Sequence, residues 1–334
     1  MSQSIYQWIM QGLVKPEQQQ EALQLAGERP TASAWLVFSR NLLLLLGLLS
    51  LAFGVVFFFA FNWNEMGRMY KFAALQVLLV LSFVGYYFKS QSFWLSQALL
   101  LVAVIVLGAL LALFGQTYQT GADPWQLFVT WALLITPLVL FSRSEVLWVF
   151  WAVLINTGLG LYMDINHSLI GAMYSGSGWF WSYLLVNFSI LVLMELLSSQ
   201  TTSAYLQKML RVSKLRNRWS AQVLGLVVFY ILTSVGMHSL WESASHRALN
   251  FVLYASLMTL AFVYYRFKAK DLLMLTAWLM SLIAFILAYL AYVVFEGLDE
   301  GALLLMAICL IGMTTFAVQW IKQTHEVFKA EVSS

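Results

Sequence analysis

Ten long apolar runs constrain this chain more than any other feature of its sequence. A bilayer core of about 30 Å needs roughly 20 mostly apolar residues per helix. Runs such as Leu42–Leu46 are apolar on every side, whereas a membrane β-strand alternates with period two. The sequence therefore predicts an all-α, polytopic transmembrane bundle of about ten spans. The predicted spans are 41–61, 70–88, 93–114, 124–141, 146–163, 179–197, 222–238, 248–266, 272–295 and 301–321.

The composition agrees with a membrane solvent. Hydrophobic residues make up 61% of the chain and charged residues 10%, against about 45–50% and about 25% in soluble domains. A soluble fold of this length lacks the polar surface to cover that much apolar area. The single cysteine, Cys309, excludes an internal disulfide framework. The first apolar run follows a polar stretch of 40 residues, which is not the pattern of a cleavable signal peptide.

The distribution of Lys and Arg predicts the orientation. Cytoplasmic segments of membrane proteins retain an excess of these residues. With the N-terminus inside and ten spans, 15 of the 18 cations lie in inner segments. The other three, Arg68, Lys71 and Arg247, lie outside. We therefore expect both termini to be cytoplasmic.

The chain divides into five predicted regions. Residues 1–40 form a cytoplasmic helical hairpin, with a first stripe that stops near Gly12 and a second helix that Pro16 opens. Such a hairpin has no core of its own and must dock on the bundle, on lipid or on a partner. The regions that follow are a first membrane half at 41–197 with six spans, a basic cytoplasmic loop at 198–221, a second membrane half at 222–321 with four spans, and a cytoplasmic tail at 322–334.

The basic loop at 198–221 interleaves apolar residues and cations, as in a helix that lies on a membrane surface. Cations near such a surface attract anionic headgroups by about 1 kcal/mol each. The loop is therefore predicted to contact anionic lipid, although the same cations also serve simply to fix the topology. The cations are Lys208, Arg211, Lys214, Arg216 and Arg218.

Two predicted outer segments, Phe61–Asn64 and Phe114–Pro124, carry distinctive motifs. Together with the helical lead-in, they resemble a bacterial predicted-membrane-protein family, domain of unknown function 2157, over roughly residues 1–145. The resemblance implies a multi-pass protein of the bacterial cytoplasmic (inner) membrane with no established activity. No catalytic residue can be carried over from it.

The same two motifs have two physical interpretations. In the first they are structural, with Asp123 as the N-cap before Pro124 and Trp63 at the headgroup level. In the second, amides and aromatic rings converge in an outward-facing cleft for an uncharged polar ligand such as a sugar or a lipid headgroup. The ligand-binding candidates are Asn62, Trp63, Asn64, Gln116, Tyr118, Gln119 and Asp123.

Ionisable residues within spans usually mark ion or proton pathways. Here we expect Glu195 and Glu296, near the ends of their spans, to reach water, and no span holds a midplane acid–base pair. The amide side chains are expected to form interhelical hydrogen bonds more often than substrate sites. They are Gln76, Gln97, Asn156, Asn187 and Asn250.

One group of residues is a weak candidate for a metal site. His238, Glu242 and His246 are spaced four apart and would share one face of a continuous helix. Asp164 and His167 lie in another outer segment. The alternative is a chain reversal in which Ser239 and Glu242 form a capping box.

The remaining motifs do not support an enzyme. Ser175–Gly178 is not a nucleophile elbow, and no phosphate-binding or dinucleotide-binding loop is present in the sequence. We expect no cofactor and no nucleic-acid partner. Two function classes remain: a transporter or handler of lipid or small polar solutes, and a membrane scaffold or sensor that contacts cytoplasmic proteins through the hairpin and the basic loop.

Overall fold

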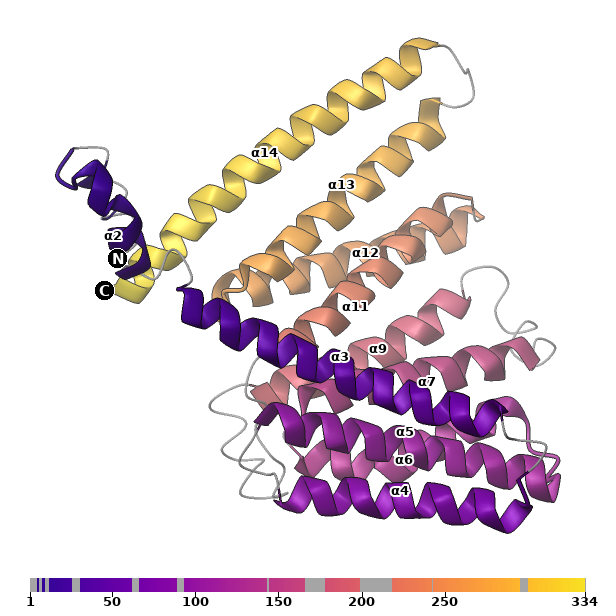
Figure 1. The fold of residues 1–334 in the computed structure, drawn as a ribbon. Coiled ribbons are helices and arrows are strands. Elements are labelled where there is room, and N and C mark those ends of the chain that lie inside the picture. Colours follow the sequence, from indigo (N-terminus) through magenta and orange to yellow (C-terminus); the bar gives the residue numbers. More distant parts are fainter. Residues whose placement is uncertain are drawn as a thin grey trace. The chain divides into compact units, whose positions relative to one another are not determined.

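The computed structural model of the protein describes residues 5, 8–9, 12–25, 31–61, 66–88, 93–142, 144–165, 178–198, 218–241, 243–294 and 300–333. Every regular element in these ranges is a helix (Figure 1). The predicted all-α bundle is therefore confirmed.

The helices belong to two compact units, Met1–Thr120 and Gly121–Ser334. The first unit contains the short 3-10 helix η1 (Pro16–Gln18), α2 (Gln19–Leu25), α3 (Ala32–Phe61), α4 (Arg68–Phe88) and α5 (Phe93–Tyr118). The second contains α6 (Pro124–Phe141), α7 (Glu145–Ile165), α9 (Gly178–Ser198), α11 (Trp219–His238), η2 (Ser239–Trp241), α12 (Ala244–Val263), the π-helical η3 (Tyr264–Lys268), α13 (Leu272–Val294) and α14 (Glu300–Ser333).

Within the described residues, nine helices are long and apolar enough to cross a membrane. They are α4, α5, α6, α7, α9, α11, α12 with η3, α13 and α14, which correspond to the second to tenth predicted runs. The first predicted run, 41–61, lies inside α3.

Two of the helices are longer than the apolar runs that predicted them. The helix α3 begins at Ala32, where Thr31 Oγ1 accepts a hydrogen bond of 3.2 Å from the Ala34 amide. The helix α14 continues to Ser333, although residues 322–334 were predicted as a tail. Hydropathy marks where lipid contact ends, but a helix continues until a cap or a breaker stops it, and residues 322–333 contain neither Gly nor Pro.

In the first unit, α5 packs against both α4 and α3. The contact between α4 and α5 is a small apolar core of Leu75, Val106 and Leu113. At the N-terminal end, Gly12 has φ of 72°, and the Leu13 amide bonds back to the Trp8 carbonyl at 2.9 Å. A positive φ is typical of a helix C-terminus that ends on glycine. As predicted, the next helix starts at Pro16.

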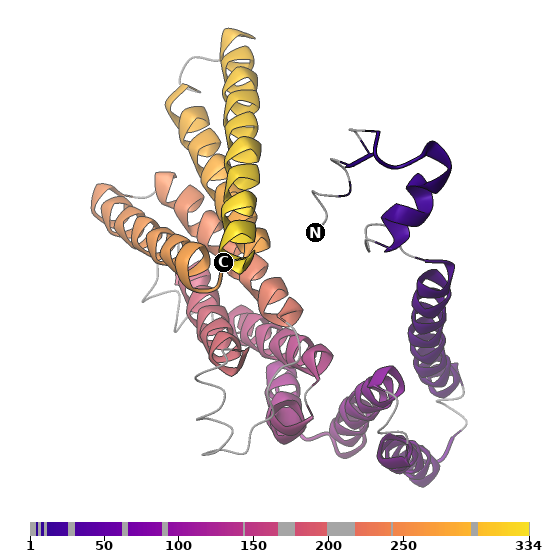
Figure 2. The ribbon, with the colours of Figure 1, turned by 90° about the vertical axis from the view of Figure 1, so that its left-hand side faces the viewer.

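In the second unit, α11 is the central helix. It packs against α7, α9, α12 and α13. Of its apolar 18-residue stretch, 56% is buried inside the protein, a larger share than in any other described span. A Cβ at Gly225 would collide with the Met274 side chain of α13. Because the atom in the way is the end of a flexible methionine side chain, a movement of Met274 would relieve this collision. The last two helices, α13 and α14, lie side by side in both views (Figure 1; Figure 2) and pack against each other.

Polar side chains connect the helices of the second unit. The amides of Asn156 (α7) and Asn187 (α9) exchange two hydrogen bonds of 2.7 and 3.0 Å. Asn250 of α12 accepts a bond of 3.1 Å from the Trp181 indole of α9. The expectation that buried amides bond between helices is confirmed for these three asparagines, which pair because no water is available in the hydrocarbon region. It is not met by Gln97, whose Oε1 is buried without a hydrogen-bond partner among the described residues, and Gln76 is exposed.

The reciprocal amide pair gives a prediction about stability. Replacing Asn187 by Leu should lower the free energy of unfolding by about 1–2 kcal/mol, because the half-buried Asn156 amide loses its partner on α9. Asn156→Leu should have a similar effect. The double variant should lose clearly less than the sum, because both halves of the pair are removed together. A double-mutant cycle measured by SDS-induced unfolding in micelles checks this, and strictly additive losses would contradict it.

Candidate functional site

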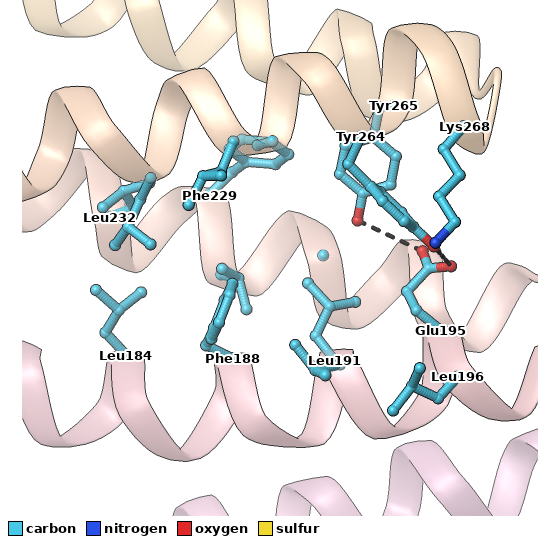
Figure 3. Close-up of a pocket in the computed structure, with 16 residues that line it drawn as sticks. Leu184, Phe188, Leu191, Glu195, Leu196, Phe229, Leu232, Tyr264, Tyr265 and Lys268 are labelled. Atoms are coloured by element: carbon cyan, nitrogen blue, oxygen red, sulfur yellow. Dashed lines mark hydrogen bonds between the residues drawn. The ribbon is translucent and has the colours of Figure 1, made fainter.

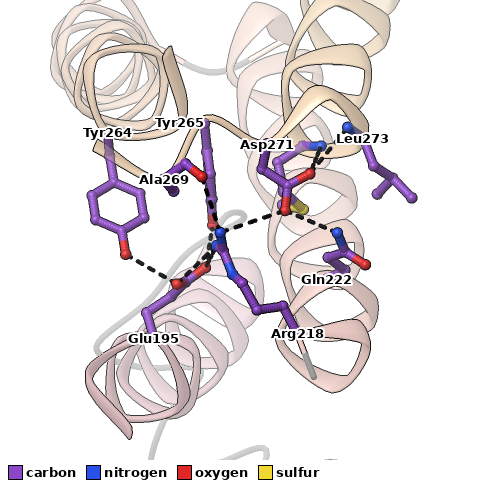
Figure 4. A network of polar contacts seen from close by, with 9 residues as sticks. Glu195, Arg218, Gln222, Tyr264, Tyr265, Ala269, Asp271 and Leu273 are labelled. Carbon is purple, nitrogen blue, oxygen red and sulfur yellow. Dashed lines mark hydrogen bonds and ion pairs between the residues drawn. The ribbon is translucent and has the colours of Figure 1, made fainter. Parts of the chain in front are cut away.

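A polar cluster lies at one end of the second unit, where four helical segments meet. Glu195 lies in the last turn of α9, Arg218 is the N-cap of α11, and Asp271 immediately precedes α13. Tyr264 and Tyr265 open the π-helical segment η3. Figure 4 shows these side chains converging on the Arg218 guanidinium. Residues distant in sequence thus form one charged network at the edge of the predicted hydrocarbon region.

Arg218 is the centre of this network. Its Nη2 lies 2.8 Å from Glu195 Oε1 and 2.9 Å from Oε2. Its Nη1 donates to the Ala269 carbonyl at 3.2 Å and lies 3.8 Å from Asp271 Oδ2. The side chains of Glu195 and Arg218 are 11% and 30% exposed. Charge-assisted bonds of this kind are stronger than neutral ones, and partial burial strengthens them further.

The carboxylate of Asp271 is satisfied mainly by the helix that it caps. Its Oδ1 accepts bonds of 3.1 and 3.3 Å from the Leu273 and Met274 amides. Its Oδ2 accepts a bond of 2.9 Å from Gln222 Nε2 of α11. A negative charge at a helix N-terminus is also favoured by the helix dipole. Asp271 therefore makes only a long contact with Arg218, and Glu195 is the main ionic partner of the guanidinium.

The π-helical segment η3 places two tyrosines on the same carboxylate. The Ala269 amide bonds to the Tyr264 carbonyl, five residues earlier, at 2.9 Å. The hydroxyl of Tyr264 then donates to Glu195 Oε2 at 3.0 Å, and that of Tyr265 donates to Oε1 at 3.5 Å. Short π-helical insertions of this kind are frequent at functional sites.

The pKa of Arg218 is raised above its ordinary value. Burial of the guanidinium alone would lower this pKa, but the facing carboxylates of Glu195 and Asp271 raise it by more. Arg218 therefore remains charged at every pH that a cell experiences.

An apolar groove begins beside this network and follows the lipid-facing side of α9, α11 and α12. Its cavity has a volume of about 340 Å³, which is within the usual range of ligand sites. Figure 3 shows Leu184 and Leu232 at one end, and Glu195 and Lys268 at the other. The other lining residues are Phe188, Leu191, Val192, Leu196, Gly225, Val228, Phe229, Leu257, Leu260, Ala261, Tyr264 and Tyr265. The groove thus has a long apolar wall and one charged end.

The described residues do not test the predicted outer cleft. Asn62, Trp63 and Asn64 lie outside them. Gln116 is exposed on α5, and Tyr118 packs against the Phe114 ring at 4.7 Å. Asp123 is the N-cap of α6, in the other unit, and its side chain makes no capping hydrogen bond.

Gln119 has a backbone role that explains its position. Its φ is 46°, and the following Thr120 amide bonds to the Gly115 carbonyl at 3.4 Å. This is the left-handed residue of a helix C-cap. The geometry accounts for Gln119 as the end of α5 without any ligand.

Of the five cations predicted to contact anionic lipid, Lys208, Arg211, Lys214 and Arg216 lie outside the described residues. Arg218 is engaged by Glu195 and Asp271. The expectation that Glu195 simply reaches water is wrong, because this carboxylate is paired with Arg218 and two tyrosines.

The chain around the metal candidates is a reversal and not a continuous helix. His238 ends α11 beside the Phe180 ring, at 5.6 Å, and α12 begins at Ala244. Glu242 and the side chain of His246 lie outside the described residues, as does His167, while Asp164 is exposed near the end of α7. Within the part of the chain that is described, no group of three His, Cys, Asp or Glu side chains is placed to hold a metal.

The capping box predicted at this reversal is also wrong. Ser239 is the C-cap of α11, and its hydroxyl donates to the Gly236 carbonyl at 2.6 Å. Ser243 is the residue at the N-cap of α12. The motif was assigned to the wrong helix end because spacing alone does not say where the chain turns.

Sequence reasoning missed the partnership of Glu195, Arg218 and Asp271. A signal was available, because all three lie at span ends that the topology places on one side. The roles of Tyr264, Tyr265 and Lys268 had no such signal, since they depend on the π-helical turn.

The comparisons with known proteins agree with the resemblance seen in the sequence. Residues 6–148 match the family described as "Predicted membrane protein (DUF2157)". This match confirms the expected resemblance over the expected region, which is less than half of the chain. Neither a curated protein nor a solved structure is detectably similar to the chain.

The ion pair can be tested by its coupling. Arg218→Gln should lower the free energy of unfolding by about 2 kcal/mol, because Glu195 is left charged and poorly solvated. Glu195→Gln should cost less, since an amide still accepts the tyrosine bonds. The double variant should recover part of the loss. Equilibrium unfolding in mixed micelles measures all three, with the exposed Lys322→Gln on α14 as a control that should change little. Independent effects of the two substitutions would argue against the pair.

Proposed function

We propose that this protein is a lipid-handling membrane protein that holds one acyl chain of a membrane lipid in the groove along α9, α11 and α12. The observation that carries the proposal is an apolar cavity of about 340 Å³ that ends at a charged cluster. A lipid has the same polarity, with a long apolar chain attached to a polar headgroup. The coarser statement, a multi-pass membrane protein that contacts lipid, does not depend on this proposal.

The wall of the groove suits an acyl chain. Its residues are leucine, valine, phenylalanine, alanine and glycine over most of its length, from Leu184 to Ala261. Several of them face the surrounding membrane, including Phe188 and Leu260, which are 41% and 62% exposed. A lipid can therefore enter sideways from the bilayer without crossing a polar barrier. Because lipid tails are as apolar as the wall, shape and the polar end must supply the preference for the groove.

The orientation of the groove follows from the predicted topology. The excess of Lys and Arg predicts that the end with Glu195 and Lys268 faces the cytoplasm. In a bacterial inner membrane, which the family resemblance favours, the headgroup would thus come from the cytoplasmic leaflet. The groove residues account for how the lipid is held, and not for a movement of lipid between leaflets.

A matched pair of substitutions tests the groove. The protein is reconstituted in vesicles of equal phosphatidylglycerol and phosphatidylcholine that carry a photoreactive diazirine in one acyl chain, and labelled peptides are mapped by mass spectrometry. Labelling should concentrate on the lining residues. Ala261→Trp fills the groove and should reduce this labelling several-fold. Ala255→Trp is the control, because Ala255 lies on the same helix, exposed and outside the groove.

The outcome separates a site from a lipid-coated surface. Equal labelling of the two tryptophan variants would contradict the proposal. Normal unfolding of Ala261→Trp in micelles is required for either conclusion, and Ala261→Leu is a milder variant should Trp disturb the bundle.

A second candidate function is a scaffold or sensor that contacts a cytoplasmic partner through residues 1–30. The observation in its favour is apolar exposure near the N-terminus, where Leu13, before η1, is 70% exposed and Leu25, the last residue of α2, is 84% exposed. A partner that covers these side chains would remove apolar surface from water. Deleting residues 1–30 should abolish a stoichiometric protein complex and leave groove labelling unchanged. An unaltered complex after the deletion would remove this candidate.

A further inference from the structure

We propose that the polar end of the groove selects an anionic phospholipid and that Lys268 binds its phosphate. This inference rests on the proposed lipid function, because it names the headgroup that belongs to the chain in the groove. It is carried by the charges at this end of the cavity and by which of them already have partners.

The groove is lined by two ionised side chains, Glu195 and Lys268. The negative charge of Glu195 is compensated inside the protein, since both carboxylate oxygens lie within 2.9 Å of Arg218 Nη2. The same oxygens accept the two tyrosine hydroxyls. Glu195 therefore has little capacity left for the cation of a lipid headgroup, and it offers little repulsion that Arg218 does not offset.

The second carboxylate of the network does not face the groove. Asp271 is buried and does not line the cavity. Its charge is met by two amides at the start of α13 and by Gln222. Its contact with Arg218 is the long one, at 3.8 Å. Neither carboxylate is thus available to neutralise a further cation at the groove end.

The ammonium of Lys268 is a cation at the groove end that these carboxylates do not neutralise. Among the described residues, no carboxylate lies within 4.0 Å of its ammonium. Its described charge contact is with the Tyr264 ring, at 5.9 Å from the centroid. The flexible stem of a lysine lies along apolar surface while its ammonium stays at the polar edge. Lys268 and Glu195 lie at the same end of the groove in Figure 3, so an acyl chain in the groove brings its headgroup to the ammonium.

The surrounding sequence adds positive charge. Residues 199–217, which connect α9 to α11, contain four cations and no acidic residue. Cations near a membrane surface favour anionic lipid. At the groove end Arg218 and Lys268 balance Glu195 and Asp271, so the excess of positive charge comes from residues 199–217. A zwitterionic headgroup would add a further cation to this balance. The charge balance therefore favours a phospholipid with a net negative charge.

The test measures headgroup preference separately from groove occupancy. The same diazirine lipids, phosphatidylglycerol and phosphatidylcholine, are supplied at equal amounts and their groove adducts are counted. The wild-type protein should favour phosphatidylglycerol by about fivefold, the effect of one surface cation. Lys268→Gln should bring the ratio close to one while adducts of phosphatidylcholine remain.

Two variants serve as controls. Lys268→Arg keeps the charge and should keep the preference. Lys322→Gln removes an equal charge from exposed α14, outside the groove, and should leave the ratio unchanged. An unchanged ratio in Lys268→Gln, or no preference in the wild type, overturns the assignment of Lys268. If groove adducts do not respond to Ala261→Trp, the lipid function itself fails, which is a different result.

Discussion

The ion pair between Glu195 and Arg218 is the interaction on which this end of the protein depends. It links the last turn of α9 to the first residue of α11, and Arg218 also holds the Ala269 carbonyl between α12 and α13. Few donors from water are available near the hydrocarbon region, so a charge there must find its partner in the protein. Satisfying Arg218 fixes the ends of three neighbouring segments at once. The shape of the charged end of the groove is therefore set by charge pairing.

The groove itself follows from how α11 packs. Gly225 of α11 lies against the Met274 side chain of α13, while α9 and α12 both pack against α11. Two helices that share a central neighbour leave a furrow between them. Its wall is apolar because all these helices face lipid. The π-helical turn at Tyr264–Lys268 then places two tyrosines and Lys268 at the end of the furrow. Packing supplies the apolar wall, and one local backbone irregularity supplies its polar end.

Much of the architecture could be predicted because a segment that contacts lipid must be apolar along its length. Apolar runs located nine spans to within a few residues, and the interhelical roles of Asn156, Asn187 and Asn250 followed from the cost of an unpaired amide in hydrocarbon. The site was not predictable in the same way. The outer motifs were predicted to bind a ligand because of their amide and aromatic residues, yet one of these residues, Gln119, ends the helix α5. Lys268 lies in the sequence between Arg266 and Lys270, and nothing there singled it out from these two cations.

The sequence by itself determined the solvent, the class of fold and the approximate span positions, because burial of apolar length in a bilayer is a local property of each segment. Hydropathy could not show that α14 continues to Ser333, since helix ends are set by caps and breakers. Only the tertiary structure decided which charges meet. Glu195, Arg218 and Asp271 are separated by 23 and 53 residues along the chain, and their pairing exists only once three helix ends come together. The groove has the same origin, because a cavity belongs to no single helix.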